Sequence, residues 1–235
     1  MASGKNRIPA LSLLLVMAFQ GCGLPTVSYL YPPAEMVVAG NQIISVQNDA
    51  RNYEASEGLT QTFKGVEIFY RIFESETTAS SVRNSLENLS DTYSDEPNTF
   101  MDIVKGDTYK FSRLRNYSEN RNQPLIPIAA DDEDYYYLQL NSYSAWRLTD
   151  NASEPLVYDS VDISQIIRSL DTSDSNASFY AKDFQTGDDD YEGTTSSTAA
   201  DYFIVFFAVS YGVDQATVGQ TVYSSPNIPS NYVSY

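Results

Sequence analysis

The strongest strand pattern along the chain runs from Phe63 to Phe73. Successive side chains of a β-strand point to opposite faces, so this stretch predicts one fully apolar face and one mixed face. The apolar face comprises Val66, Ile68, Tyr70 and Ile72. The mixed face combines Glu67 and Arg71 with Phe69 and Phe73, and we expect another element to cover the two phenylalanines. A second apolar strand is expected over 202–211.

Two stretches instead show the spacing of a helix. Val82, Leu86 and Leu89 recur at i, i+4 and i+7 after a Ser/Thr-rich start, which predicts a helix over 75–90. Apolar residues also recur at helical spacing over 163–170, behind Asp162 as a candidate N-cap. These residues are Ile163, Ile166, Ile167 and Leu170.

Shorter apolar stretches predict further strands between polar loops. Residues 36–46 indicate two short strands, or one interrupted strand, around Gly40-Asn41, and 220–224 a final strand. Further strands are expected over 107–114, 125–129, 135–140, 145–148 and 156–161. Residues 48–60 and the Ser/Thr/Asp/Gly-rich stretch 171–200 are expected to be loops. The sequence thus predicts a mainly β protein with two short helices.

The first 21 residues have the pattern of a bacterial secretory signal. Lys5 and Arg7 precede an apolar run over 8–19, shorter than the roughly 20 residues that a helix needs to cross a bilayer. The sequence Phe19-Gln20-Gly21-Cys22 then contains the only cysteine and resembles the relaxed lipobox of spirochaete lipoproteins. This resemblance implies a signal peptide over 1–21 and a lipid, such as palmitate, on Cys22. A conventional signal peptide with an incidental cysteine is the alternative.

The proline-containing residues 22–34 are expected to be an extended tether, followed by a single β-rich domain over 35–235. Within this domain, three strands resemble those of fibronectin type III domains. Residues 65–71 are similar to the C strand, 202–212 to the F strand and 218–226 to the G strand.

The fibronectin resemblance implies a fibronectin- or immunoglobulin-like β-sandwich. Tyr202 would then occupy the tyrosine-corner position, with its ring in the core and its hydroxyl bonded to a nearby backbone group. About 130 residues separate the strands similar to C and F, so the sandwich would carry a large insertion at about 75–200, with the two short helices inside it.

Charge and composition exclude several classes of function. The chain has 14 basic and 31 acidic residues, and removal of 1–21 would leave 12 basic ones and a net charge of −19. Nucleic acid is therefore not expected as a partner, because phosphate binding needs clustered cations. The chain also has no histidine. With Cys22 lipidated, Ser-His-Asp, Cys-His and ordinary zinc sites are excluded, and no cofactor is expected.

Carboxylates are the remaining side chains that could bind a metal or take part in catalysis, and they are concentrated in acidic stretches of the sequence. Oxygen-rich clusters bind Ca²⁺, which makes one of these stretches a candidate calcium site, although its spacing is not that of an EF-hand. The candidate ligands are Asp188, Asp189, Asp190 and Glu192. The alternative is a solvated acidic loop that maintains solubility.

An aromatic stretch is the second candidate site. Tyr135, Tyr137, Tyr143 and Trp146 could form a surface that binds a glycan or a protein, because such side chains offer large contact areas at low entropic cost. The alternative is a strand that simply points Tyr136 to one face and Tyr135 and Tyr137 to the other.

These features together predict a lipid-anchored lipoprotein of the bacterial envelope, on the outer membrane or the periplasmic side. We expect a non-enzymatic binding or structural module whose partner is an envelope protein or a glycan. The alternative function is a carboxylate-dependent glycan hydrolase, which requires two acids to face each other across a pocket.

The lipid anchor can be tested by metabolic labelling. We expect radioactive palmitate to label the wild-type protein and not the Cys22→Ser variant, because the thiol is the acylation site. Label retained by Cys22→Ser would contradict the anchor.

Overall fold

The computed structural model describes most of the chain from Leu30 to Ser234. The described ranges are 30–39, 42–54, 61–116, 124–127, 135–140, 146–150, 153–158, 160–168, 184–194, 202–215 and 219–234. The expected signal peptide, Cys22 and Tyr143 lie outside these residues.

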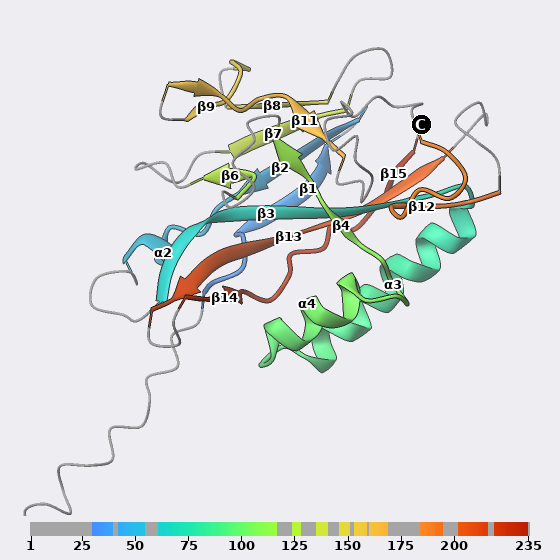
Figure 1. Ribbon diagram of the computed structural model, residues 1–235, viewed down its shortest axis with the longest axis horizontal. Helices are drawn as coiled ribbons and strands as arrows, with labels where there is room; N and C mark the ends of the chain where they lie inside the picture. Colours follow the sequence, from blue (N-terminus) through green and yellow to red (C-terminus); the bar gives the residue numbers. More distant parts are fainter. Residues whose placement is uncertain are drawn as a thin grey trace, which may run out of the picture.

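The described residues form a mainly β structure centred on two long strands (Figure 1). β3 (Gln61–Phe73) runs antiparallel to β13 (Phe203–Asp214), with Phe73 opposite Phe203 and Gln61 opposite Asp214. β13 also pairs with β14 (Gln220–Tyr223) and β15 (Val233–Ser234). β3 pairs with three further strands, β4 (Ser112–Arg113), β6 (Ile126–Pro127) and, in parallel, β12 (Tyr191–Glu192). The result is a seven-stranded sheet.

A four-stranded antiparallel sheet packs against one face of the seven-stranded sheet. Its order is β1 (Glu35–Ala39), β2 (Ile43–Gln47), β7 (Tyr135–Gln139) and β8 (Arg147–Thr149). The predicted pair of short strands around Gly40-Asn41 is confirmed by the antiparallel pairing of β1 with β2. Side chains of both sheets share one hydrophobic core, which includes Ile44, Leu138, Leu148, Ile68 and Phe206.

Two helices cover the other face of the seven-stranded sheet (Figure 1). The predicted helix over 75–90 is confirmed as α3 (Glu76–Thr92), and Ser75 caps it by accepting a hydrogen bond from the Thr78 amide at 3.3 Å. α4 (Pro97–Lys105) was not predicted, although Pro97 stands at its start and Phe100 and Val104 are four residues apart on its buried face. The short α2 (Arg51–Glu54) lies in a stretch expected to be a loop.

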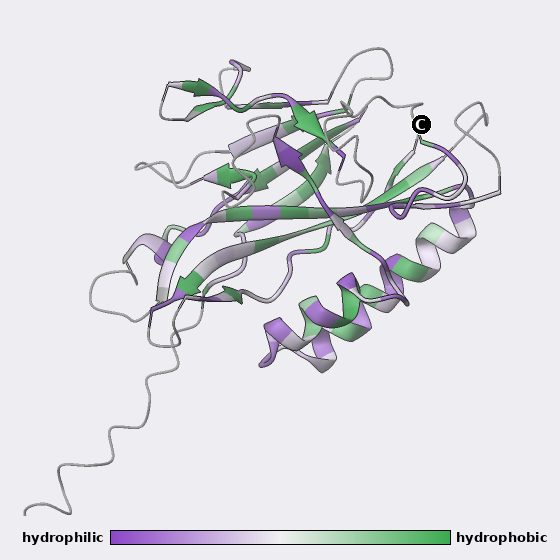
Figure 2. Cartoon of the chain, viewed as in Figure 1, coloured by the Kyte–Doolittle hydropathy of each residue, from purple (hydrophilic) through white to green (hydrophobic). Residues whose placement is uncertain are grey.

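The predicted division of β3 into two faces is confirmed. Val66, Ile68, Tyr70 and Ile72 belong to the core between the sheets. Phe69 and Phe73 belong to a second core with residues of α3 and α4, including Leu86 and Phe100. Both central strands accordingly carry hydrophobic stretches along their length (Figure 2). The central sheet is therefore buried on both sides.

The predicted helix over 163–170 is wrong. Ile166 and Ile167 form a short strand, β11, that pairs antiparallel with β5 (Arg115–Asn116), and the described residues 160–168 contain no helix. Ile163 and Ile166 are buried, so the apolar spacing reflects burial rather than helical period. Long-range strand pairing has overridden a local pattern that also fits a helix.

Two further short strands lie between β8 and β11. β9 (Val157–Tyr158) and β10 (Val161–Asp162) form a two-stranded hairpin within a stretch expected to contain one strand. No helix among the described residues is long and apolar enough to cross a membrane.

A helix residue closes one edge of the seven-stranded sheet. Asn98 of α4 donates a hydrogen bond from Nδ2 to the carbonyl of Thr221 at 3.2 Å and accepts one from the Tyr223 amide at 3.0 Å. Its side-chain amide thus takes the place of a neighbouring strand beside β14.

Gly65 offers a test of the close approach between β3 and β6. Its φ is +145°, and an added Cβ would lie 2.1 Å from the Ile126 carbonyl oxygen. We expect Gly65→Ala to lower the free energy of unfolding by about 2–4 kcal/mol in urea titrations, because strain and overpacking add together. Gly187→Ala is the matched control, since Gly187 has a φ of +104° but no atom within 4 Å of an added Cβ. Equal losses in both variants would contradict the steric argument.

Candidate functional site

The outer face of the four-stranded sheet is the candidate site, because it gathers tyrosines that the sequence singled out. In β7, Tyr136 and Leu138 point into the core, whereas Tyr135 and Tyr137 are half-buried on the opposite face. Alternation along β7 thus brings Tyr135 and Tyr137 together, as a strand requires. Their rings stack with centroids 6.4 Å apart and an interplanar angle of 26°.

Strand register extends this face across the whole sheet. Val37, Ser45, Tyr137 and Thr149 lie side by side in one row, which Pro155 continues through a bridge to Thr149. A second row contains Ala39, Ile43, Gln139 and Arg147, which Gln165 continues through a bridge to Arg147. The third row contains Glu35, Gln47 and Tyr135. The three rows make up what we call the tyrosine face.

Hydrogen bonding positions the first of the two tyrosines. The Tyr135 hydroxyl donates to Oε2 of Glu35 at 3.0 Å, across two strand spacings. This bond to a carboxylate stabilises the protonated phenol and raises the pKa of Tyr135. The ring of Tyr135 is thereby held parallel to that of Tyr137, so the two present one aromatic surface.

A buried hydroxyl lies next to Tyr137 in the same row. Thr149 is 4% exposed, and its Oγ1 has no hydrogen-bond partner among the described residues. The register places Thr149 directly beside Tyr137 on the neighbouring strand. Arg147, in the neighbouring row, is exposed and adds a cationic donor.

The structure places the other predicted aromatic residue elsewhere. Trp146 is fully buried in the core between the sheets, with its ring 5.8 Å from that of Phe206. It therefore supports the sheet and is no part of the tyrosine face. Tyr202 is also buried, as the resemblance implied for its ring, and meets Phe184 edge-on at 4.6 Å.

The candidate calcium ligands instead engage arginines. Asp190 is fully buried and binds Arg168, whose Nε donates to Oδ2 at 2.9 Å, and it also accepts a hydrogen bond from the Tyr70 hydroxyl. Asp188 accepts from Nη2 of Arg168 at 2.8 Å. Burial opposes the charge of Arg168, but its interactions with Asp190, Tyr70 and Asp188 together outweigh burial and raise the pKa of Arg168. For Asp190, the solvated-loop interpretation is therefore wrong.

The remaining members of the acidic stretch are spread apart. Glu192 forms an ion pair with Arg71 at 2.7 Å, and Asp189 is exposed. Within the described part of the chain, no three acidic side chains converge in a metal-binding arrangement. Two residues of the stretch 188–192 accordingly bind side chains of β3: Asp190 binds Tyr70, and Glu192 binds Arg71.

A second buried carboxylate lies on the helix side of the sheet. Glu67 is fully buried, and Oε1 accepts a hydrogen bond from Nη1 of Arg113 at 2.7 Å. Burial raises the pKa of Glu67, and the charge of Arg113 opposes this shift. The sequence predicted that Glu67 lies on the mixed face of β3, but it did not predict that Arg113 of β4 is its partner.

Comparisons with protein family models, with curated proteins and with solved structures find no match for this chain.

The contribution of the Arg168–Asp190 pair to the free energy of unfolding can be tested by substitution. We expect Asp190→Asn to lower the free energy of unfolding by about 3 kcal/mol, because it removes the fully buried counter-charge of Arg168 and leaves only the partly exposed Asp188 as an ionic partner. Asp189→Asn removes the same charge from an exposed neighbour and should change little. Urea unfolding followed by the fluorescence of Trp146, the single tryptophan, measures both. Similar stabilities for the two variants would contradict a structural role of Asp190.

Proposed function

We propose that this protein is a lipid-anchored, non-enzymatic binding module of the bacterial envelope, and that its tyrosine face binds a glycan. The observation that carries the proposal is the stacked pair Tyr135 and Tyr137 on the outer face of the four-stranded sheet.

The chemistry of the tyrosine face suits a neutral, hydroxyl-rich ligand. Aromatic rings offer a flat apolar surface to the C–H groups of a sugar, and side-chain amides and hydroxyls offer hydrogen bonds to its hydroxyl groups. Gln47 and Gln139 supply such groups in two of the three rows. Only Glu35 and Arg147 are charged among the row residues, in a chain whose net charge is −17. An ionic ligand would require more charge than this face carries.

The anchor in this proposal is the lipid on Cys22, in a protein similar to spirochaete lipoproteins. A lipid supplies membrane attachment that a strongly acidic domain would not achieve by adsorption to anionic lipid. The membrane is thus a partner through the lipid, and neither nucleic acid nor a cofactor is involved.

The fold in this proposal is a fibronectin-like or immunoglobulin-like sandwich. Support comes from strand order, because β3, β13 and β14 are antiparallel neighbours in the order expected for the C, F and G strands. The pair of packed sheets also suits a sandwich. The helices α3 and α4, which cover the outer face of the larger sheet, belong to the insertion at about 75–200.

Placement of the buried acids favours binding over glycan hydrolysis. Asp190 contacts Tyr70 on the sandwich side of β3, whereas Glu67 lies on the helix side. A hydrolytic pair must flank one bond, with carboxyl groups about 5–10 Å apart across an open site. These two carboxylates are fully buried, are bound by arginines and are separated by the central sheet.

Sedimentation with purified peptidoglycan sacculi tests the glycan site. We expect the mature lipoprotein in detergent to bind the sacculi, and Tyr137→Ala to bind at least about tenfold more weakly, because truncation of a central aromatic contact costs more than about 1.4 kcal/mol. Tyr137→Phe keeps the ring and should stay within about threefold of wild type. Trp146 fluorescence reports whether each variant is folded.

Two results would contradict this site. Wild-type protein that does not sediment with sacculi would remove the glycan strands of peptidoglycan as the ligand. Equal binding by folded Tyr137→Ala would remove the tyrosine face as the binding surface.

A further inference from the structure

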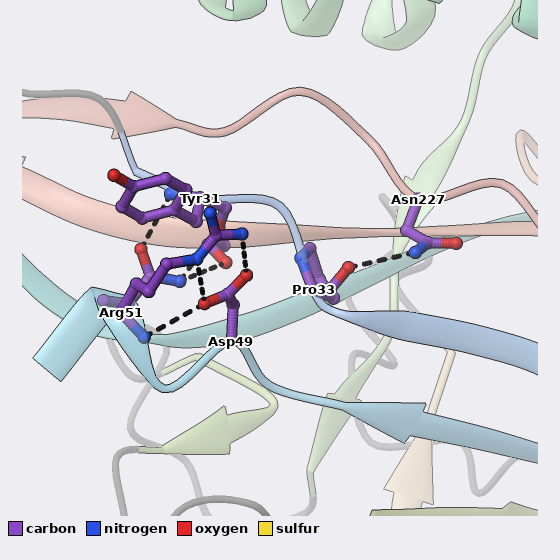
Figure 3. Close-up of polar contacts among 7 residues, drawn as sticks. Tyr31, Pro33, Asp49, Arg51 and Asn227 are labelled. Atoms are coloured by element: carbon purple, nitrogen blue, oxygen red, sulfur yellow. Dashed lines mark hydrogen bonds and ion pairs between the residues drawn. The ribbon is translucent and has the colours of Figure 1, made fainter.

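A short segment, residues 30–34, is held against the fold by the side chains of Asn52 and Asn227; we call it the strap (Figure 3). Asn52 of α2 holds Tyr31 by both of its backbone groups, accepting from the Tyr31 amide at 2.8 Å and donating to its carbonyl at 2.9 Å. Asn52 is 1% exposed and also donates to Oγ of Ser210 on β13 at 3.1 Å. One amide side chain thus joins the strap to a central strand.

Further contacts extend this attachment along the strap. Leu30 packs against the core between the sheets. Nδ2 of Asn227 donates to the Pro33 carbonyl at 2.9 Å, and the backbone of Asn227 is itself bonded to Ala208 of β13 in both directions. The Ala34 amide donates to the Gln47 carbonyl at 2.8 Å. The strap is therefore part of the fold from Leu30 onward, although its composition predicted a tether.

The strap limits how far the fold can lie from a lipid on Cys22. Eight residue steps separate Cys22 from Leu30, and a fully extended chain spans at most about 3.6 Å per residue, or about 29 Å in total. A tether running free to Ala34 would reach about 14 Å farther. Fastening the strap thus keeps the end of the fold around Tyr31 within about 29 Å of the lipid.

The surface at this end suits contact with lipid head groups. Tyr31 is 36% exposed, and the guanidinium of Arg51 lies 3.9 Å from its ring centroid. Nε of Arg51 also donates to Asp49 at 2.9 Å, so the charge of Arg51 is matched by a neighbouring carboxylate. Tyrosine is favoured at membrane interfaces because its ring is apolar and its hydroxyl is polar. An exposed aromatic residue beside a neutral ion pair avoids the repulsion that the acidic chain would otherwise meet at anionic lipid.

We infer that the end of the fold bearing Tyr31, Ala50 and Arg51 rests on the lipid head groups and fixes the orientation of the anchored domain. This inference rests on the lipid anchor in the proposed function. The strap packs beside Gly212, which pairs with Phe63 near the start of β3. β3 has 13 residues and extends about 40 Å to its other end, near Ser75 and the start of α3. The far end of β3 is thereby held away from the membrane.

Site-directed fluorescence tests the orientation, since Cys22 is the only cysteine and would be blocked by lipid. Ala50→Cys labels the strap end, and Thr77→Cys labels the far end; both residues are exposed. Each variant of the mature lipoprotein is labelled with an environment-sensitive dye and reconstituted into phosphatidylcholine–phosphatidylglycerol vesicles that contain head-group spin-labelled lipid. We expect quenching at position 50 to exceed quenching at position 77 several-fold.

A further substitution tests the role of the strap. Asn52→Ala in the Ala50→Cys background removes the fastening, and we expect quenching at position 50 to fall while Trp146 fluorescence shows a folded core. If Asn52→Ala does not fold, Tyr31→Ser in the same background gives the comparison, because it removes the exposed ring and keeps the backbone bonds.

The outcomes separate the two proposals. Protein that does not float with the vesicles would overturn the lipid anchor, and the orientation with it. Protein that floats but is quenched equally at positions 50 and 77, or more strongly at 77, would overturn the orientation alone.

Discussion

The pairing of β3 with β13, buried on both faces, is the constraint on which the rest of the structure depends. A strand between two cores cannot turn its polar side chains to water, and each of them needs a partner inside the protein. Tyr70 binds Asp190, Glu67 binds Arg113, Arg71 binds Glu192 and Ser210 binds Asn52. The partners come from three separate stretches of chain, since Asp190 and Glu192 belong to the same acidic stretch. The polar residues of two strands therefore determine where β4, the acidic stretch and the strap dock.

This constraint explains which parts of the fold could be predicted from the sequence. The faces of β3 and the helix α3 follow from local periodicity, and the structure agrees. The residues around Ile166 fit a helix locally, but they pair with β5 about fifty positions earlier, which no local pattern encodes. α4 is short, and its apolar residues are few, so it gave little periodic signal. Local secondary-structure preferences are overridden wherever a distant strand supplies the backbone hydrogen-bond partners.

Part of the candidate site likewise followed from local periodicity, and the rest depended on contacts between distant residues. Alternation within β7 placed Tyr135 and Tyr137 together, because period two holds for any strand. Trp146 lies seven residues beyond Gln139 and precedes β8, so its direction depended on a connection that the sequence did not determine. Likewise, the acids at 188–192 fit a solvated or cation-binding loop by sequence alone, because no local pattern indicates that Arg168 binds Asp188 and Asp190. Its partnership with Asp190 joins two positions that are 22 residues apart.

Asn98 has a consequence beyond the geometry of α4. An unpaired strand edge is a template on which a second chain can add its own strand. By occupying the carbonyl of Thr221 and the amide of Tyr223, Asn98 leaves no such template at that position. A single side-chain amide in the helix thus discourages edge-to-edge aggregation, the hazard that comes with building a protein around long, hydrophobic strands.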